Sequence, residues 1–212
     1  MILLEYIRRD IVIHFRQNIL IYLLVIFILI TGIMAGAFTV VQLSSEQKLY
    51  VGNYIREFFN SQQSLPVDRG AIFRQGLWQH FWSVFFIWFF GMFFWGAPFI
   101  LIIIGIRGFF LGFTVGFMVE HYTFGGFLFS LVCILPQSLI YLLAYLAMGI
   151  YTLVFCIDSF KNRKTRFTSS QIKQKIGIHT IRILLLFLVI LLGITLETLI
   201  TPLFFPLFTW IF

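Results

Sequence analysis

The sequence predicts an all-α, polytopic helical membrane protein with about five transmembrane helices, the middle ones broken or kinked. Of its 212 residues, 60% are hydrophobic and only 11% are charged, and phenylalanine alone occurs 29 times. A helix of ~20 apolar residues spans the ~30 Å hydrocarbon core of a bilayer. Continuous apolar stretches disfavour a membrane β-barrel, whose strands alternate. The apolar stretches are residues 19–41, 81–104, 109–119, 124–157 and 183–200.

The positive charge of the chain is placed near the predicted membrane ends, where it indicates orientation. Arg8, Arg9 and Arg16 precede the first apolar stretch, and seven basic residues occur in residues 158–182. Lys and Arg are enriched in cytoplasmic segments, so both regions are expected in the cytoplasm. The net charge of +7 therefore predicts contact with membrane lipid and no nucleic-acid partner. We expect one integral membrane domain, 1–212, comprising a cytoplasmic N-terminus 1–18, an outer loop 42–76, a cytoplasmic basic loop 158–178 and an outer C-terminus 201–212.

The first apolar stretch imitates a secretory signal, because a basic flank precedes it and Ala35-Gly36-Ala37 resembles a cleavage site. It is longer than the apolar region of a usual signal, so we expect an uncleaved transmembrane helix. An even number of crossings must separate the two basic regions. Four crossings fit if residues 105–108 form a tight cytoplasmic turn, from which Arg107 reaches the lipid headgroups.

The middle apolar stretches are irregular in length. Residues 109–119 are too few for a full span, and extension through Tyr122 or Phe124 gives a helix that just reaches the outer face. The alternative is a re-entrant segment, which bilayers tolerate only where protein or water covers the freed backbone. In the long stretch 124–157, Pro136 removes one helical hydrogen bond, so a kink is expected at Pro136 and Gln137.

The outer loop is long enough for one helix and a turn. Residues 44–47, Ser-Ser-Glu-Gln, have the chemistry of a helix start, and aromatic residues follow at helical spacing. One interpretation is an amphipathic helix that lies on the membrane or caps the bundle. The other is a docking face for an extracytoplasmic partner, for which the candidate contacts are Tyr50, Tyr54 and Phe58.

Glycine spacing provides a packing signal in two of the expected helices. Gly108, Gly112 and Gly116 form two overlapping GxxxG repeats, and Gly32 and Gly36 form another in the first stretch. Such faces allow helix backbones to approach closely. Packing within one subunit is the first interpretation. Homodimerisation through these faces, which would make a homo-oligomer, is the alternative, and backbone lining a cavity is a third.

No pattern in the chain indicates catalysis, a cofactor or a metal. A metal motif, a nucleophile triad, a phosphate loop and a pair of carboxylates at catalytic spacing are all missing from the sequence. The chain is therefore not expected to be an enzyme. Cys133 and Cys156 lie inside an apolar stretch and are expected to be small core residues. The histidines are expected to be interfacial polar residues: His14, His80, His121 and His179.

Arg107, Glu120 and Glu197 are the polar intramembrane candidates, and carboxylates in a bilayer suggest function by default. Glu120 marks an outer helix end, and Glu197 is expected about a turn from the outer interface. The alternative function is a channel or transporter built from the broken middle helices, with Glu120, Gln137 and Glu197 lining its path. No charged residue lies between Glu120 and Asp158, which disfavours ion-coupled transport.

From Arg107 onward, the order of features resembles the stage II sporulation protein M family of endospore-forming bacteria. The stretches that carry the resemblance are Arg107-Gly-Phe-Phe-Leu-Gly-Phe-Thr-Val-Gly-Phe-Met-Val119, then Gly125-Gly126, then Leu135-Pro-Gln-Ser-Leu-Ile140. More distant members of the superfamily often carry His and Glu after this proline, where this chain has Gln137 and Tyr141. That difference fits the sporulation branch.

The resemblance implies a mother-cell membrane protein that is needed for forespore engulfment. It further implies a complex at the septum with two cell-wall-degrading partners, the stage II sporulation proteins D and P, which themselves cut peptidoglycan. The leading hypothesis is therefore a non-enzymatic scaffold, in which residues 49–59 and the turn 122–125 bind the partners.

Overall fold

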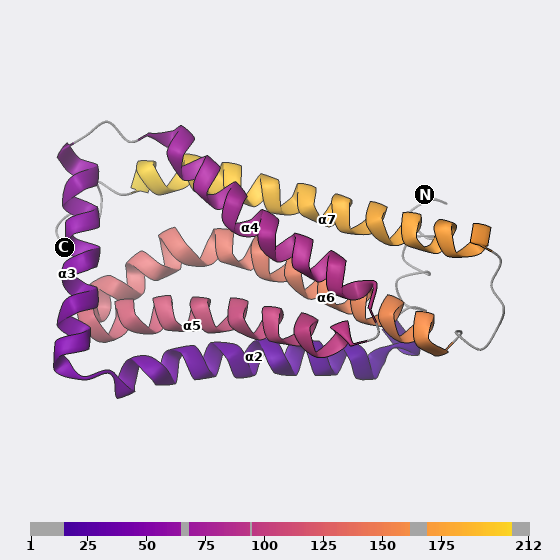
Figure 1. The fold of residues 1–212 in the computed structure, drawn as a ribbon. Coiled ribbons are helices and arrows are strands. Elements are labelled where there is room, and N and C mark those ends of the chain that lie inside the picture. The colour runs from indigo at the N-terminus through magenta and orange to yellow at the C-terminus, as the bar shows by residue number, and fades with distance from the viewer. Residues whose placement is uncertain (1–14, 65–67, 94, 162–168, 205–212) are drawn as a thin grey trace.

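The computed structural model describes residues 15–64, 68–93, 95–161 and 169–204, and these residues form helices without any strand. This confirms the predicted fold class (Figure 1). The elements are α2 (Ile19–Gln42), α3 (Ser45–Ser64), α4 (Arg69–Gly91), α5 (Gly96–Phe129), the π-helix η1 (Ser130–Ile134), α6 (Leu135–Lys161) and α7 (Ser169–Phe204).

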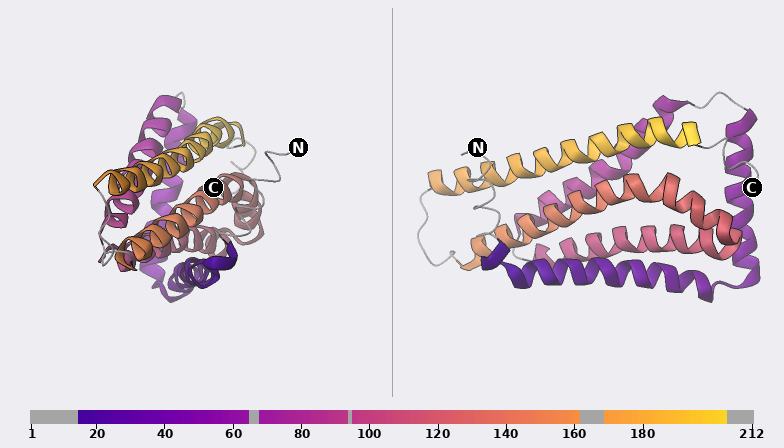
Figure 2. Two further views of the ribbon diagram at one scale, coloured as in Figure 1. Left: turned by 90° about the vertical axis from the view of Figure 1, so that its right-hand side faces the viewer. Right: turned by 180° about the vertical axis from the view of Figure 1, so that it is seen from behind.

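The helices α2, α4, α5, α6 and α7 lie side by side in an elongated bundle, and α3 crosses one end of it (Figures 1 and 2). The opposite end holds the starts of α2 and α7, the ends of α4 and α6, and the turn between α4 and α5. We call this opposite end the basic end, because Lys173, Lys175 and Arg182 lie in the first turns of α7. Arg16, which directly precedes α2, lies at the same end, whereas Arg8, Arg9 and the basic residues 163–166 lie outside the described residues.

Three helical stretches of the described residues are long and apolar enough to cross a membrane: Ile19–Gln42, Gly96–Ser159 and Lys173–Leu199. The middle stretch contains both α5 and most of α6, which run in opposite directions (Figure 1). α4 lies beside them, but Arg69 and Arg74 make its first half more polar. Hydrophobic side chains also face outward along the bundle, as expected where lipid replaces water.

The predicted span 81–104 and the predicted turn 105–108 are wrong. α4 ends at Gly91, the chain reverses direction, and α5 begins at Gly96. Residues 105–108 therefore lie inside α5, and residues 109–119 continue the same helix without a break. The error arose because Met92, Phe93 and Trp95 at the true turn are as apolar as the helices beside them. The turn is tight, and a Cβ atom on Gly96 would overlap the carbonyl of Phe90.

The far end of α5 contains the main backbone irregularity of the bundle. Thr123 has φ 50° and ψ −128°, which breaks the helix there. Gly125 and Gly126 follow in the reversal, and a Cβ atom on Gly126 would overlap the carbonyl of Met118. Five π-helical residues then precede Pro136, which lies at the second position of α6. Wider π turns often occur where the α-helical hydrogen-bond pattern is interrupted.

Thr123→Gly should stabilise the protein by about 1 kcal/mol. A β-branched residue at positive φ is strained by about 1–3 kcal/mol, and glycine relieves this strain. Part of the relief is lost because glycine gives the unfolded chain more conformational entropy. The free energy of unfolding in mixed detergent micelles measures the effect. Thr114→Gly is the matched control, since Thr114 lies in regular helix and is exposed. There glycine should destabilise by about 1 kcal/mol. Equal losses at both positions would contradict strain at Thr123.

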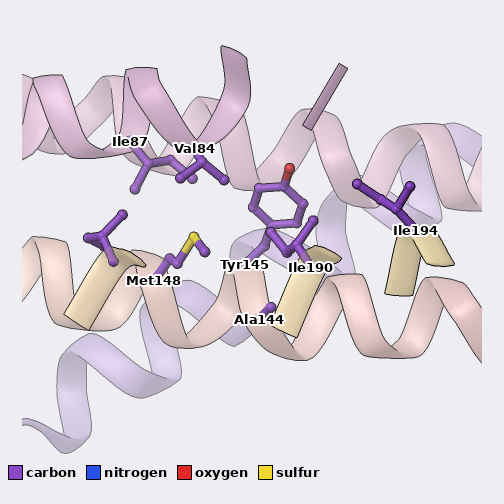
Figure 3. Close-up of a cluster of buried hydrophobic side chains, with 8 residues drawn as sticks. Val84, Ile87, Ala144, Tyr145, Met148, Ile190 and Ile194 are labelled. Atoms are coloured by element: carbon purple, nitrogen blue, oxygen red, sulfur yellow. The ribbon is translucent and has the colours of Figure 1, made fainter. Parts of the chain in front are cut away.

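Two of the hydrophobic clusters join the long helices of the bundle. One joins α2, α5 and α6 around Val25, Ile100 and Ile104, each fully buried. The other joins α4, α6 and α7, and in it Tyr145 rises from α6 with its hydroxyl directed toward α4 (Figure 3). Cys133 and Cys156 are buried and do not form a disulfide, as expected of small core residues, and Cys156 Sγ lies 3.2 Å from the carbonyl oxygen of Phe93.

The GxxxG glycines lie where α2 meets α5 within one chain. A Cβ atom on Gly32 would overlap the carbonyl oxygen of Gly105, and one on Gly36 that of Phe109. From the other side, Cβ atoms on Gly108 and Gly112 would overlap the carbonyls of Leu29 and Ile33. A Cβ atom on Gly116 would lie 3.1 Å from the Cα atom of Ala37. The two backbones are thus in direct contact over about three turns.

Candidate functional site

α3 begins where the sequence has the chemistry of a helix start, and two reciprocal hydrogen bonds form there. The Ser44 backbone N–H donates to Gln47 Oε1 at 3.0 Å, and the Gln47 N–H donates to Ser44 Oγ at 3.3 Å. This capping box satisfies two backbone donors that have no partner within the helix. It fixes the point at which the chain leaves α2 and turns across the end of the bundle.

One face of α3 rests on the end of α5. Lys48 Nζ lies 2.9 Å from Glu120 Oε1, and a Cβ atom on Gly52 would lie 2.7 Å from the imidazole of His121. One turn further on, Ile55 packs against the cluster that contains Met118. These α3 residues recur every three or four positions, so they form a single docked face. Glu120, expected at an outer helix end, is thus paired with the helix that covers that end.

The other face of α3 carries the residues that were predicted as candidates for binding a partner. Tyr50 and Tyr54 are 75% and 66% exposed, and they follow the docked Lys48 and Gly52 by two positions, or about 200° around the helix. We call Tyr50 and Tyr54 the tyrosine face. Phe58 is the next position in this series, but its side chain lies outside the described part of the structure.

A second candidate site lies inside the bundle, around Arg107. Arg107 is in the middle of α5, so its predicted position at a cytoplasmic turn is wrong. Its Nη2 atom donates to the backbone carbonyl of Gln79 at 3.0 Å and to the hydroxyl of Ser83, both on α4. Its guanidinium carbon lies 4.8 Å from the ring centroid of Tyr145 on α6. These contacts give the cation its partners within the bundle.

Tyr145 connects Arg107 to a histidine of α4. The Tyr145 hydroxyl lies 2.9 Å from Nδ1 of His80, and both side chains are buried. The expectation that His80 is interfacial is therefore wrong, and the same holds for His179, which is buried and stacks on Phe155 at 4.3 Å between ring centroids. In both cases a polar ring that seemed suited to a membrane surface is enclosed by aromatic neighbours.

The chain of contacts continues from His80 to a carboxylate on α7. The ring of Tyr141 lies 4.3 Å from that of His80, between centroids, and its hydroxyl donates to Glu197 Oε2 at 2.6 Å. Gly193 makes room for this tyrosine, since a Cβ atom there would lie 2.6 Å from Cε1 of Tyr141. We call the whole series the polar chain; its members are Arg107, Ser83, Tyr145, His80, Tyr141 and Glu197.

The polar chain joins a cation of α5 to an acid of α7 through side chains of α4 and α6. Hydrogen bonds are stronger away from water, and an unpaired polar group is correspondingly costly there. The chain can therefore hold four helices in one register. Sequence reasoning missed Ser83, His80, Tyr141 and Tyr145. The sequence did contain one signal: Gln79 and Ser83 are four residues apart, and so are Tyr141 and Tyr145. Residues four apart lie on the same face of a helix.

Other predicted polar positions do not join this chain in the described structure. Gln137 Oε1 is buried without a hydrogen-bond partner. A groove between α4 and α7 has an apolar lining that includes none of Glu120, Gln137 and Glu197. Among the described residues, no three His, Cys, Asp or Glu side chains are grouped so as to hold a metal ion.

The apolar helices, their close glycine contact and the polar chain in their midst define a helical integral membrane protein. The sequence model of the family described as stage II sporulation protein M matches residues 24–202. The chain therefore belongs to the stage II sporulation protein M family and is a sporulation-related membrane protein. No curated protein and no solved structure matches it in the corresponding comparisons.

Proposed function

We propose that this protein is a non-enzymatic, multi-pass scaffold of the engulfment complex in the mother-cell membrane at the sporulation septum. In this role it recruits and positions peptidoglycan-degrading partners, the stage II sporulation proteins D and P. Membership of the family supports a role in sporulation, and the position of the basic end supports an orientation with α3 on the outer face. α3 would then stand on the side of the membrane where peptidoglycan lies.

The observation that carries the proposal is the two-sided character of α3. One side is fixed to α5 through Lys48, Gly52 and Ile55, while the tyrosine face is directed away from the bundle. Exposed tyrosines on a rigid element are typical of protein interfaces, because they offer a large contact area at a small loss of conformational entropy. A fixed helix that presents aromatic rings is suited to holding a partner.

The test is the combined variant Tyr50→Asp/Tyr54→Asp, expressed in sporulating cells and purified with its partners. Two charges in a contact surface should reduce recovery of both hydrolases at least tenfold, since interface hot spots each contribute ~2 kcal/mol or more. Recovery is measured by quantitative immunoblotting, normalised to the membrane level of the variant. Adding Phe58→Asp extends the test to the third predicted contact.

Two control variants separate loss of the aromatic surface from other effects. Tyr50→Phe/Tyr54→Phe keeps the rings and should retain both partners. Asn53→Asp adds a charge at an exposed position between the tyrosines without removing a ring, and should also retain them. Undiminished recovery of both hydrolases with the aspartate pair, at normal membrane levels, would reject this face as the binding surface.

A further inference from the structure

An apolar groove lies between α4 and α7. Phe81 and Phe187, with their ring centroids 6.5 Å apart, line its part farther from the basic end, and Trp88 and Thr180 line its part nearer to that end. The Trp88 indole N–H donates to Thr180 Oγ1 at 3.0 Å. The polar atoms of this pair are thus already engaged with each other. The lining therefore suits a hydrocarbon chain.

The same face of α7 continues past the groove to a lysine. Lys173 precedes Thr180 by seven residues, or two helical turns, and so lies above it on one side of the helix. Between them, a Cβ atom on Gly177 would meet no described atom within 4 Å. Lys173 is exposed and is the first residue of the apolar stretch of α7. A cation thus stands at the membrane boundary, at the open end of an apolar groove.

The dimensions agree with one lipid leaflet. From Phe187 to Thr180, and again from Thr180 to Lys173, the helix rises ~10 Å over seven residues. The sum of ~20 Å matches half of a bilayer with its headgroups, which is ~40–45 Å thick in all. A phosphate beside Lys173 would therefore place its acyl chain beside Trp88 and Leu184.

We propose that the groove between α4 and α7 binds one anionic phospholipid, with an acyl chain between Trp88 and Leu184 and the phosphate on Lys173. The charge complementarity decides the occupant, because an apolar groove alone would accept any lipid or a partner's helix. One lysine near an anionic headgroup gives a preference of about fivefold over a zwitterionic lipid. The protein would thereby select its lipid at the end of the bundle opposite α3.

The experiment is native mass spectrometry of the full chain in detergent, titrated with phosphatidylglycerol or phosphatidylcholine of identical acyl chains. For the unaltered protein, the dissociation constant of the first bound lipid should be about fivefold lower with phosphatidylglycerol than with phosphatidylcholine. Lys173→Glu should remove this preference. Leu184→Trp, which fills the groove from an exposed position, should weaken binding of both lipids.

Matched variants on the opposite side of α7 provide the controls. Lys175→Glu makes the same charge change about 140° away from the groove face, and Leu185→Trp makes the same enlargement at an exposed position off the groove. Both should bind like the unaltered protein. Equal affinity for the two lipids, or an equal loss in Lys175→Glu, overturns the assignment of the phosphate. Unchanged lipid binding in Leu184→Trp overturns the groove as the acyl site and leaves a partner's transmembrane helix as its occupant.

Discussion

Gly112→Ala is expected to destabilise the protein by about 3 kcal/mol or more and to lower its membrane level. The added Cβ atom would overlap the carbonyl oxygen, carbon and Cα of Ile33, all of them backbone atoms of α2. Overpacking costs about 1–3 kcal/mol where side chains can yield, and here a helix backbone must move instead. Since close backbone contact is the main source of helix association in lipid, a displaced α2 loses several contacts together.

The matched control for this substitution is Gly105→Ala in the same helix. A Cβ atom there would lie 3.4 Å from Cγ2 of Ile28, an ordinary contact distance. Alanine also favours helix over glycine by up to about 1 kcal/mol, so this variant should be neutral or slightly stabilised. Thermal unfolding in detergent micelles compares the two proteins. Equal melting temperatures for Gly112→Ala and Gly105→Ala would refute the tight contact between α2 and α5.

Tyr141→Phe should destabilise the bundle by about 2 kcal/mol, the second largest effect we expect. Hydrogen bonds to charged groups contribute ~1.5–3 kcal/mol, whereas ordinary side-chain hydrogen bonds between helices in bilayers average only ~0.6 kcal/mol. Without the tyrosine hydroxyl, the half-buried Glu197 carboxylate loses its described donor while its surroundings stay apolar. We therefore expect a loss of the size typical of a hydrogen bond to a charged group.

A double-mutant cycle tests whether the loss arises at Glu197. In Glu197→Leu, the carboxylate is absent, so adding Tyr141→Phe should have little further effect on the free energy of unfolding. Both single variants and the double variant are unfolded in mixed micelles under the same conditions. Additive losses in the double variant would show that the hydroxyl and the carboxylate act independently, contrary to the described bond.

Hydropathy and charge predicted much of the fold because lipid imposes simple rules. The helical membrane class and the helix after the Ser44 capping box followed from local sequence. The true turn between Gly91 and Gly96 did not, because Phe93 and Trp95 within it are as apolar as the helices on either side. Gly96, where the two backbones nearly touch, is the feature that marks it.

The candidate sites were predictable to different degrees. The tyrosine face follows from helical spacing alone, since Tyr50 and Tyr54 are one turn apart. The polar chain could not be found in this way, because its members come from four helices and meet only when these pack. Arg107 and Glu197 stood out as intramembrane charges, but the side chains between them, His80 and Tyr145 among them, were visible only in the structure.

By itself, the sequence determined that this protein is made of apolar helices suited to a membrane, and that two of them carry glycine faces for close packing. These properties depend on the transfer of side chains into lipid and on local backbone geometry, which act residue by residue. Tertiary structure alone decided which helices the glycines join, where the chain reverses and which partners Arg107 and Glu197 find. These depend on contacts between residues far apart in the chain, and such contacts exist only once the helices have packed.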